Sequence, residues 1–397
     1  MIRVSITIRA MTQRGQRGNL QARMPDGLLG KLSPRQFLLH HWQKRPLFVP
    51  GAIPDCGSWL CPSTLFTLAA RSDVQSRLVI STRNRWTVQH GPFRRADLRG
   101  LPTGGWTLLV QGLEQHLSQA IDLLCLFSFT PHARLDDLMV SYAPPGGGVG
   151  PHFDSYDVFL LQGAGTRRWR VSAQKNLDCV ENAPLRILKN FSHTREWVTQ
   201  RGDLLYLPPR YAHDGVALDD CMTLSIGFRA PRKRELASRF LEFLQDDLQA
   251  DGALGGLYED PDLRLQKHPA ALSPAMLEKI TRVLRHIRWN AHDVGRFAGC
   301  YLSEPAAQTV FKRPRRAVVL PEFVRRVSVK GVRLALPTRM LFRGGTIFIN
   351  GESHLLPPKD HAPLVRLADR RVTPAFTPSH VGARLLHAWY RAGYIKI

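Results

Sequence analysis

The sequence predicts an α+β protein of two or three domains with a β domain at its centre. Short β segments separated by Pro and Gly breakers occupy residues 138–230, a spacing typical of closed or double-sheet β architectures. After Pro231 the apolar residues follow a helical period instead. Beyond Pro305 a hairpin signal precedes further helical patterns. With 397 residues, the chain is longer than one typical domain.

The N-terminal residues 1–25 form a basic arm to which we assign no fold. Residues 1–23 hold five arginines, and no acidic residue precedes Asp26. This composition is similar to that of a transit peptide, but it lacks the apolar stretch and the cleavage site of a secretory signal. A flexible arm fits the pattern, and so does a start codon assigned too early, with Met24 as the true start.

A first domain is expected over residues 26–232. Ser and Pro mark its helix starts, and apolar residues alternate in its strands. Its first elements are helices from Ser33 and Ser63, strands 76–82 and 86–89, and a turn at 83–85. The later β segments are 138–142, 152–162, 166–172, 203–207 and 222–228.

Residues 233–303 are predicted to be helical, with amphipathic helices over 232–249 and from Ser273 onward. Because these helices bring no sheet of their own, they could form a linker bundle or an oligomerisation module. The spacing of their apolar residues does not separate the two interpretations.

Residues 304–397 form a third unit. Asn350-Gly351 between two alternating runs is a strong hairpin signal, and two helices follow at 363–370 and 380–392. Helices with a two-stranded wing suggest a winged-helix module. Ten Lys or Arg residues lie between Lys312 and Arg343, against the single acid Glu322. The unit could therefore bind nucleic acid electrostatically, or equally dock a protein.

The composition narrows the class of protein. A hydrophobic content of 44% supports a packed core, and no apolar run is long enough to span a membrane. The six cysteines form no C-x-x-C pair, so we expect reduced thiols in a cytoplasmic protein rather than zinc sites or disulfides. The net charge of +23 indicates an acidic partner such as nucleic acid, or only the arginine-rich surface that a high-GC genome produces.

His152 and Asp154, with His213 about sixty residues later, carry the candidate chemistry. Two histidines and one carboxylate are the ligands of the facial triad that holds Fe(II) and leaves coordination positions open. Residues i and i+2 of a strand point to the same side, so His152 and Asp154 can converge on one ion. An isolated His-x-Asp is usually structural, but here a Gly-rich loop leads into it and a second histidine follows. We place His213 in a loop.

A ferrous centre of this kind needs a reducing cosubstrate, and 2-oxoglutarate would need a cationic anchor for its far carboxylate. The strand expected after the one bearing His152 offers Arg167, Arg168 and Arg170. Arg167 and Arg168 cannot both point into a barrel, because adjacent strand residues face opposite sides. We expect Arg168 to face away from the side shared by Arg167 and Arg170. Any single one of them could also lie on a solvated outer face.

Long motifs resemble the bacterial ribosomal oxygenases of the JmjC, cupin-like superfamily: 141–159 (SYAPPGGGVGPHFDSYDVF), 162–171, 202–209 and 225–231. The resemblance implies a double-stranded β-helix (jelly-roll) catalytic domain, a helical dimerisation region and a C-terminal winged-helix domain. It implies Fe(II) on His152, Asp154 and His213, O2 as oxidant, and 2-oxoglutarate held by Arg167 and a hydroxyl at Ser141. It also implies 3-hydroxylation of an arginine in the large-subunit ribosomal protein L-sixteen.

Two other functions stay open: the same chemistry on a histidyl or N-methylated residue, and a non-catalytic ribosome- or nucleic-acid-binding protein. The net charge of +23 is a departure from the family, whose members are less basic. A basic ribosomal substrate would be repelled by such a charge. Contact with ribosomal RNA could bridge the two, or the pocket could be locally acidic. The candidates for local acid are Asp157, Asp214, Asp219 and Asp220.

Overall fold

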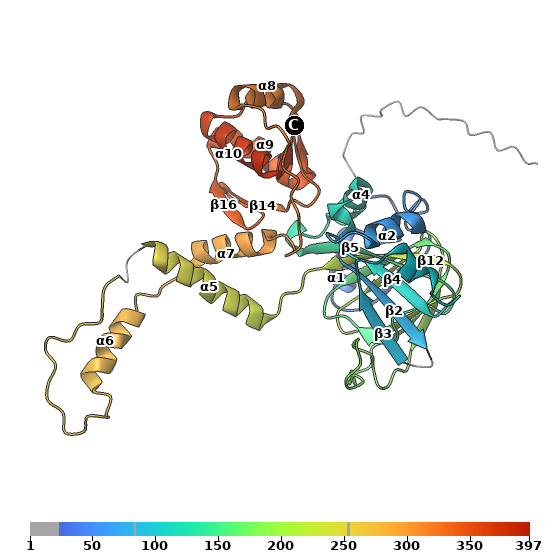
Figure 1. The fold of residues 1–397 in the computed structure, drawn as a ribbon, viewed down its shortest axis with the longest axis horizontal. Coiled ribbons are helices and arrows are strands. Elements are labelled where there is room, and N and C mark those ends of the chain that lie inside the picture. Colours follow the sequence, from blue (N-terminus) through green and yellow to red (C-terminus); the bar gives the residue numbers. More distant parts are fainter. Residues whose placement is uncertain (1–23, 83–84, 252–254) are drawn as a thin grey trace, which may run out of the picture.

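The structure, a computed structural model, describes residues 24–82, 85–251 and 255–397 (Figure 1). The basic arm up to residue 23 and positions 83–84 of the expected turn lie outside these residues. A β domain is followed by helices α5 (Lys233–Asp251) and α6 (Pro274–Leu284), which extend away from it. Helix α7 (Ala291–Ser303) leads back to a C-terminal unit.

Two antiparallel sheets build the β domain. The larger has the strand order β1-β10-β7-β12-β5-β4-β2-β3, and the smaller has the order β6-β11-β8-β9. This arrangement is the double-stranded β-helix that the resemblance implied. The larger sheet contains β1 (Leu47–Val49), β2 (Ser76–Thr82), β3 (Arg85–His90), β4 (Trp106–Val110), β5 (Leu135–Ala143), β7 (Val158–Ala164), β10 (Leu204–Leu207) and β12 (Cys221–Phe228). The smaller sheet contains β6 (His152–Phe153), β8 (Arg167–Ser172), β9 (Arg195–Thr199) and β11 (Ala212–Ala217).

One face of the larger sheet packs on helices and forms the main core. The Ser33 side chain caps the first of these helices, whose Phe37 is fully buried. The Phe37 ring lies 4.9 Å from that of Tyr206 and 5.5 Å from that of Phe159. The opposite face of the sheet is thereby left free to line a cavity. The helical elements here are α1 (Pro34–His40), α2 (Pro62–Ala69), α3 (Arg95–Arg99) and α4 (Ser118–Cys125), with 3-10 turns η1 (Leu113–Gln115) and η2 (His132–Arg134).

The single β segment expected over 152–162 is wrong, because this stretch contributes strands to both sheets. Strand β6 ends at Phe153 in the smaller sheet, and β7 begins at Val158 in the larger one. The backbone carbonyl of Asp154 accepts a hydrogen bond from Arg210 N (2.7 Å), which fixes the segment that connects the smaller sheet to the larger one. The apolar residues on either side conceal this break in the sequence.

The loop expected around His213 is also wrong. His213 lies in strand β11, between β6 and β8, and is paired with His152 on one side and Val171 on the other. The sequence Ala-His-Asp-Gly has low strand propensity, so tertiary pairing determines this strand. Strand β9, which borders β8, was likewise not expected.

The C-terminal unit has the hairpin predicted at Asn350-Gly351, formed by strands β15 and β16. Helix α9 begins at Pro358 instead of residue 363, because a proline fits the first turn of a helix. The elements are α8 (Leu320–Lys330), α9 (Pro358–Arg370), α10 (His380–Ala392), β13 (Val332–Leu334), β14 (Met340–Arg343), β15 (Thr346–Ile349), β16 (Glu352–Leu355), β17 (Val372–Thr373) and β18 (Ile395–Lys396). Within the described ranges, no helix combines the length and apolarity needed to cross a membrane.

Candidate active site

The inner faces of the two sheets enclose a cavity of about 460 Å³. Side chains alternate along a strand, so every second residue of β5 and β12 faces this space while the residues between them join the core. Cross-strand pairing places these inner residues side by side, with Ser141 opposite Thr223 and Met139 opposite Ser225. The inner residues of the two strands are Asp137, Met139 and Ser141, and Thr223, Ser225 and Gly227.

His152, Asp154 and His213 meet at one side of this cavity. One nitrogen or oxygen atom from each lies within 4.8 Å of the other two. The two imidazole centroids are 4.2 Å apart, because β6 and β11 pair His152 directly with His213. Asp154 follows the end of β6, and its Oδ2 is 3.8 Å from His213 Nε2. The structure therefore brings together the three side chains that the sequence singled out.

Backbone carbonyls fix the orientation of both imidazoles. Gly150 O lies 2.8 Å from His152 Nδ1, and Tyr211 O lies 2.9 Å from His213 Nδ1. A carbonyl only accepts hydrogen bonds, so each Nδ1 must carry the proton and each Nε2 keeps its lone pair. Burial, together with the neighbouring His152, lowers the pKa of His213 to about 4. The His213 ring is consequently neutral at pH 7, as a metal ligand must be.

These donors fit a divalent transition metal. Two neutral imidazole nitrogens and one carboxylate on one side of a cavity form the donor set of the Fe(II) facial triad. The hydrogen bonds from each Nδ1 to a carbonyl are the outer contacts that orient histidine ligands in metal sites.

Arg167 is buried in the same cavity with only 4% of its surface exposed. Its Nη2 contacts the Cys221 sulfur at 3.5 Å, and its Nε has no hydrogen-bond partner among the described residues. No carboxylate of the described chain lies within 4 Å of its guanidinium. A buried cation without a counterion is costly, so an anionic ligand fits this position. Ser141 lines the cavity as well, and its hydroxyl contacts Thr223 O at 3.5 Å.

The other arginines of β8 face outward. Arg170 pairs with Glu196 at 2.8 Å, and both Arg168 and Arg170 are partly exposed. The expectation that Arg170 shares a side with Arg167 is wrong, since residues three apart in a strand face opposite sides. Strand β8 also follows β7 instead of the strand bearing His152, and it pairs with β11.

Sequence reasoning missed Asp137, Tyr156 and Arg77, which line the cavity. Burial, together with the nearby Glu114, raises the pKa of Asp137 to about 7. Burial also raises the pKa of Tyr156, with Asp154 as the next cause. The signal for Asp137 in the sequence is its even spacing from Ser141 on one strand. That spacing becomes informative only when the inner face of the strand is known.

None of the four aspartates expected to supply local acid lines the cavity. Asp157 is fully buried elsewhere and accepts hydrogen bonds from Tyr206 (2.6 Å) and Gln43 (2.8 Å). Asp219 holds Thr166 at the turn before β8. The local acid of the cavity comes instead from Asp137 and Asp154.

Comparisons with known proteins agree with this geometry. A JmjC domain family model matches residues 122–236, and a ROXA-like winged-helix model matches residues 286–396. The ribosomal protein uL16 3-hydroxylase of Escherichia coli K12 is 35% identical over 80% of this chain and 84% of its own. A probable ribosomal oxygenase of Haemophilus influenzae is 37% identical over 63% of this chain and 60% of its own.

Solved structures give the same result. The X-ray structure of E. coli YcfD matches with a TM-score of 0.79 and 31% identity, covering 92% of this chain and 98% of the other. A structure of YcfD, a ribosomal oxygenase from E. coli, in complex with cobalt and 2-oxoglutarate matches with a TM-score of 0.77. Fold, motifs and identity over most of both chains lead to one conclusion: this chain belongs to the JmjC ribosomal oxygenase family.

Proposed function

We propose that this protein is an Fe(II)- and 2-oxoglutarate-dependent oxygenase that hydroxylates the 3-position of an arginine side chain in a large-subunit ribosomal protein. One observation carries the proposal. His152, Asp154 and His213 converge in a cavity that is also lined by Arg167, which is buried and has no carboxylate partner among the described residues. The E. coli relative is named for 3-hydroxylation of ribosomal protein uL16, which supports this substrate class. We further infer that the protein acts in the cytoplasm, where ribosomal proteins are found.

Each residue of the site has a distinct task in this function. His152, Asp154 and His213 would hold the metal, which supplies oxygen activation with 2-oxoglutarate as the reductant when both are bound. Arg167 would pair with the far carboxylate of the cosubstrate, and the Ser141 hydroxyl would donate a further hydrogen bond. The Arg167 guanidinium lies 5.7 Å from the centre of the Trp169 ring, and Val158 and Leu160 also line the cavity, so these contacts would form in apolar surroundings that strengthen them.

Asp137 supports arginine as the target residue. Its half-buried side chain lines the cavity and lacks a cationic partner within 4 Å in the described chain. A guanidinium would give it paired charge-assisted hydrogen bonds and would favour its ionised form. A neutral imidazole gains less from a carboxylate, and an N-methyl group gains least. The observed acid therefore favours arginine over the histidyl and methylated alternatives.

The test is a turnover assay in air with Fe(II), 2-oxoglutarate, ascorbate and peptides from large-subunit ribosomal proteins. We expect succinate to form and one arginine-containing peptide to gain about 16 Da, the mass of one oxygen atom. Fragmentation should place the oxygen on the arginine side chain. Absence of both succinate and mass gain would refute the proposal. Peptide binding that is unchanged in His152→Ala, in a protein that retains no iron, would support the non-catalytic alternative.

We also propose that the chain forms a homodimer through its helical region. Helix α6 stands away from the rest of the chain (Figure 1) and has no fully buried residue. Its apolar side chains share one face yet are 38–56% exposed, so a second copy is the partner that would cover them. These side chains are Leu277, Ile280, Val283 and Leu284.

The oligomeric state tests this proposal directly. Leu277→Glu should yield a monomer by light scattering, because a charge on the apolar face cannot be buried. Arg282→Glu, on the opposite face of α6, is the matched control and should leave the dimer intact. A monomeric wild type would refute the proposal.

The domain limits 26–232, 233–303 and 304–397 also stay a proposal, since the winged-helix match begins at residue 286 and so includes α7.

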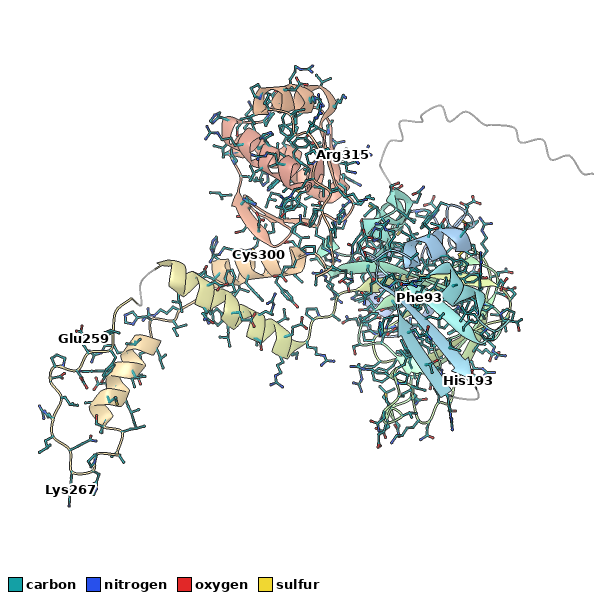
Figure 2. All side chains as sticks on the ribbon, viewed as in Figure 1. Phe93, His193, Glu259, Lys267, Cys300 and Arg315 are labelled. Carbon is teal, nitrogen blue, oxygen red and sulfur yellow. The ribbon has the colours of Figure 1, made fainter. Side chains whose placement is uncertain are left out.

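We infer in addition that the C-terminal unit contacts ribosomal RNA. Residues 304–397 contain 17 Lys or Arg against five Asp or Glu. The segment 312–316 contributes four exposed bases, of which Arg315 is labelled in Figure 2, and its backbone lies against Gly393. Strand pairing also sets the exposed Arg333 and Lys396 side by side, an arrangement that is unfavourable without a counterion. A phosphate backbone would supply the missing negative charge.

Binding of a ribosomal RNA fragment at several salt concentrations tests this contact. The double variant Arg315→Glu/Arg316→Glu should bind more weakly, and its slope of log affinity against log salt should be smaller by about two. Hydroxylation of a free peptide should be unchanged. Lys175→Glu, an exposed position on the catalytic domain, is the matched control. Equal affinities of the double variant and wild type would refute the contact.

A further inference from the structure

Strand β5 presents two adjacent aspartates to two different environments. Asp137 faces the cavity, so its neighbour Asp136 must face the other way. On that other side lies the C-terminal unit, whose Arg339 reaches Asp136. The same short piece of backbone thus carries a cavity residue on one face and an inter-unit contact on the other.

Arg339 contacts the backbone of β5 at its first residues. Its Nη2 donates to Asp136 O at 2.6 Å, and its Nη1 donates to Leu135 O at 3.5 Å. Nη2 also lies 3.5 Å from Asp136 Oδ1. The backbone of Arg339 is itself fixed, since it exchanges two hydrogen bonds with Asn350 at the wing turn.

Arg229 completes this contact from the end of β12. Its Nε donates to Asp136 Oδ1 at 3.1 Å. Its two Nη atoms donate to Leu302 O (2.9 Å) and Glu304 O (3.0 Å), just where α7 ends. Two arginines therefore contact Asp136 of β5: Arg339 comes from the C-terminal unit, and Arg229 also binds the end of α7.

We propose that Arg339 of the winged-helix unit is a positioning residue for the reaction, holding the start of β5 so that Asp137 presents its carboxyl to the target side chain. This rests on the proposed function, in which Asp137 receives the guanidinium of the substrate. Arg339 touches no substrate, and it acts through the carbonyls of Leu135 and Asp136. The winged-helix unit is then part of the specificity of the enzyme in addition to any role in RNA contact.

Arg339 also contributes to the charge around Asp137. Burial raises the pKa of Asp137, Glu114 of η1 and Asp136 of β5 raise it further, and the amide of Gly112 and the guanidinium of Arg339 lower it. Tyr156, from the loop after β6, also faces Asp137. Removing the Arg339 charge should therefore move the ionisation of Asp137 to higher pH.

The experiment compares Arg339→Met, Arg339→Lys and Arg343→Met in the full-length protein. Arg343 is the matched control, because it lies on β14, is exposed and has no acidic partner among the described residues. We expect Arg339→Met to raise the peptide KM about tenfold, while kcat and the KM for 2-oxoglutarate change less than about twofold. The pH at which peptide KM improves should also move upward. Arg339→Lys keeps the charge, so its pH profile should stay near that of the wild type.

If Arg339 only stabilised the fold, its replacement would not change the peptide KM while leaving kcat and the KM for 2-oxoglutarate nearly unchanged. Peptide KM and pH profile equal to those of Arg343→Met would overturn the proposal, as would an equal loss in kcat and both KM values. If Arg339→Met does not fold, Arg339→Lys decides by the same split between peptide KM and the other constants. Failure of the proposed function itself is distinguishable, because the wild type would then oxidise no arginine peptide.

Discussion

Replacing Arg167 by Met separates ligand binding from protein stability. Met keeps most of the side-chain length and removes the charge. Two charge-assisted hydrogen bonds to a carboxylate contribute about 1.5–3 kcal/mol each. The two hydrogen bonds join the same two groups and are therefore not fully additive, so a loss of about 3–4 kcal/mol is expected. The dissociation constant for 2-oxoglutarate should then rise about 10²- to 10³-fold.

The stability of the same variant without cosubstrate should move the other way. Arg167 is 4% exposed, and no carboxylate of the described chain pairs with it. Burying an unpaired guanidinium costs several kcal/mol, and Met does not carry that cost. Arg167→Met should therefore melt at the same temperature as the wild type or higher.

Thermal melting with and without 2-oxoglutarate measures both effects. At a ligand concentration of about 100 times its dissociation constant, the wild type should gain about 2.7 kcal/mol, and the variant should gain almost nothing. Arg168→Met is the control, because its side chain lies on the outer side of β8. Arg167 is not the anchor of the cosubstrate if Arg167→Met binds 2-oxoglutarate within about threefold of wild type, and it is not a costly buried charge if the variant without 2-oxoglutarate is less stable than wild type.

Three further predictions follow from the site and the helical region. Asp154→Ala should retain the fold by circular dichroism but lose bound iron by elemental analysis and form no succinate, because two histidines alone hold the metal weakly. Asp137→Asn should flatten the dependence of stability on pH. The folded-state pKa of Asp137 is about 7, above its unfolded value of about 4, so the wild type binds an extra proton and loses stability as pH rises between these values. Denaturant melts from pH 4 to 8 check this slope. Leu277→Glu should halve the mass in solution, and an unchanged mass would contradict the dimer.

The parts of the site that could be predicted from the sequence are those whose residues lie close together along the chain. His152 and Asp154 are two residues apart, so their convergence could be expected from strand geometry before the structure was known. Arg167 and Ser141 could be assigned only through the resemblance to a family. The structure adds a physical reason for Arg167, which is buried and has no carboxylate partner in the part of the chain that the structure describes.

The missed features depend on long-range pairing. Asp136 and Asp137 are adjacent residues of the same type, so the sequence does not indicate which of them faces the cavity. The pairing of β5 with β4 and β12 decides this. His213 lies in a strand because β6 and β8 flank it, although its neighbours have low strand propensity. The break between β6 and β7 is similar, since apolar residues continue on both sides of it while the chain changes sheets.

The basic balance of the chain and the proposed cationic target are compatible because the two charge effects act over different distances. At physiological salt, exposed charges more than about 8 Å apart are largely screened. The net charge of +23 therefore affects mainly how fast partners approach, and has little effect on contacts inside the cavity. Inside the cavity, Asp154 would be neutralised by a bound metal and Arg167 by the cosubstrate. Asp137 is then the remaining carboxyl among the cavity residues of the described chain, and it meets its partner in contact. Repulsion between the two basic proteins on approach and attraction between Asp137 and the target side chain can thus coexist. A substrate bound to RNA would be repelled less on approach, and its contact with Asp137 would be unchanged.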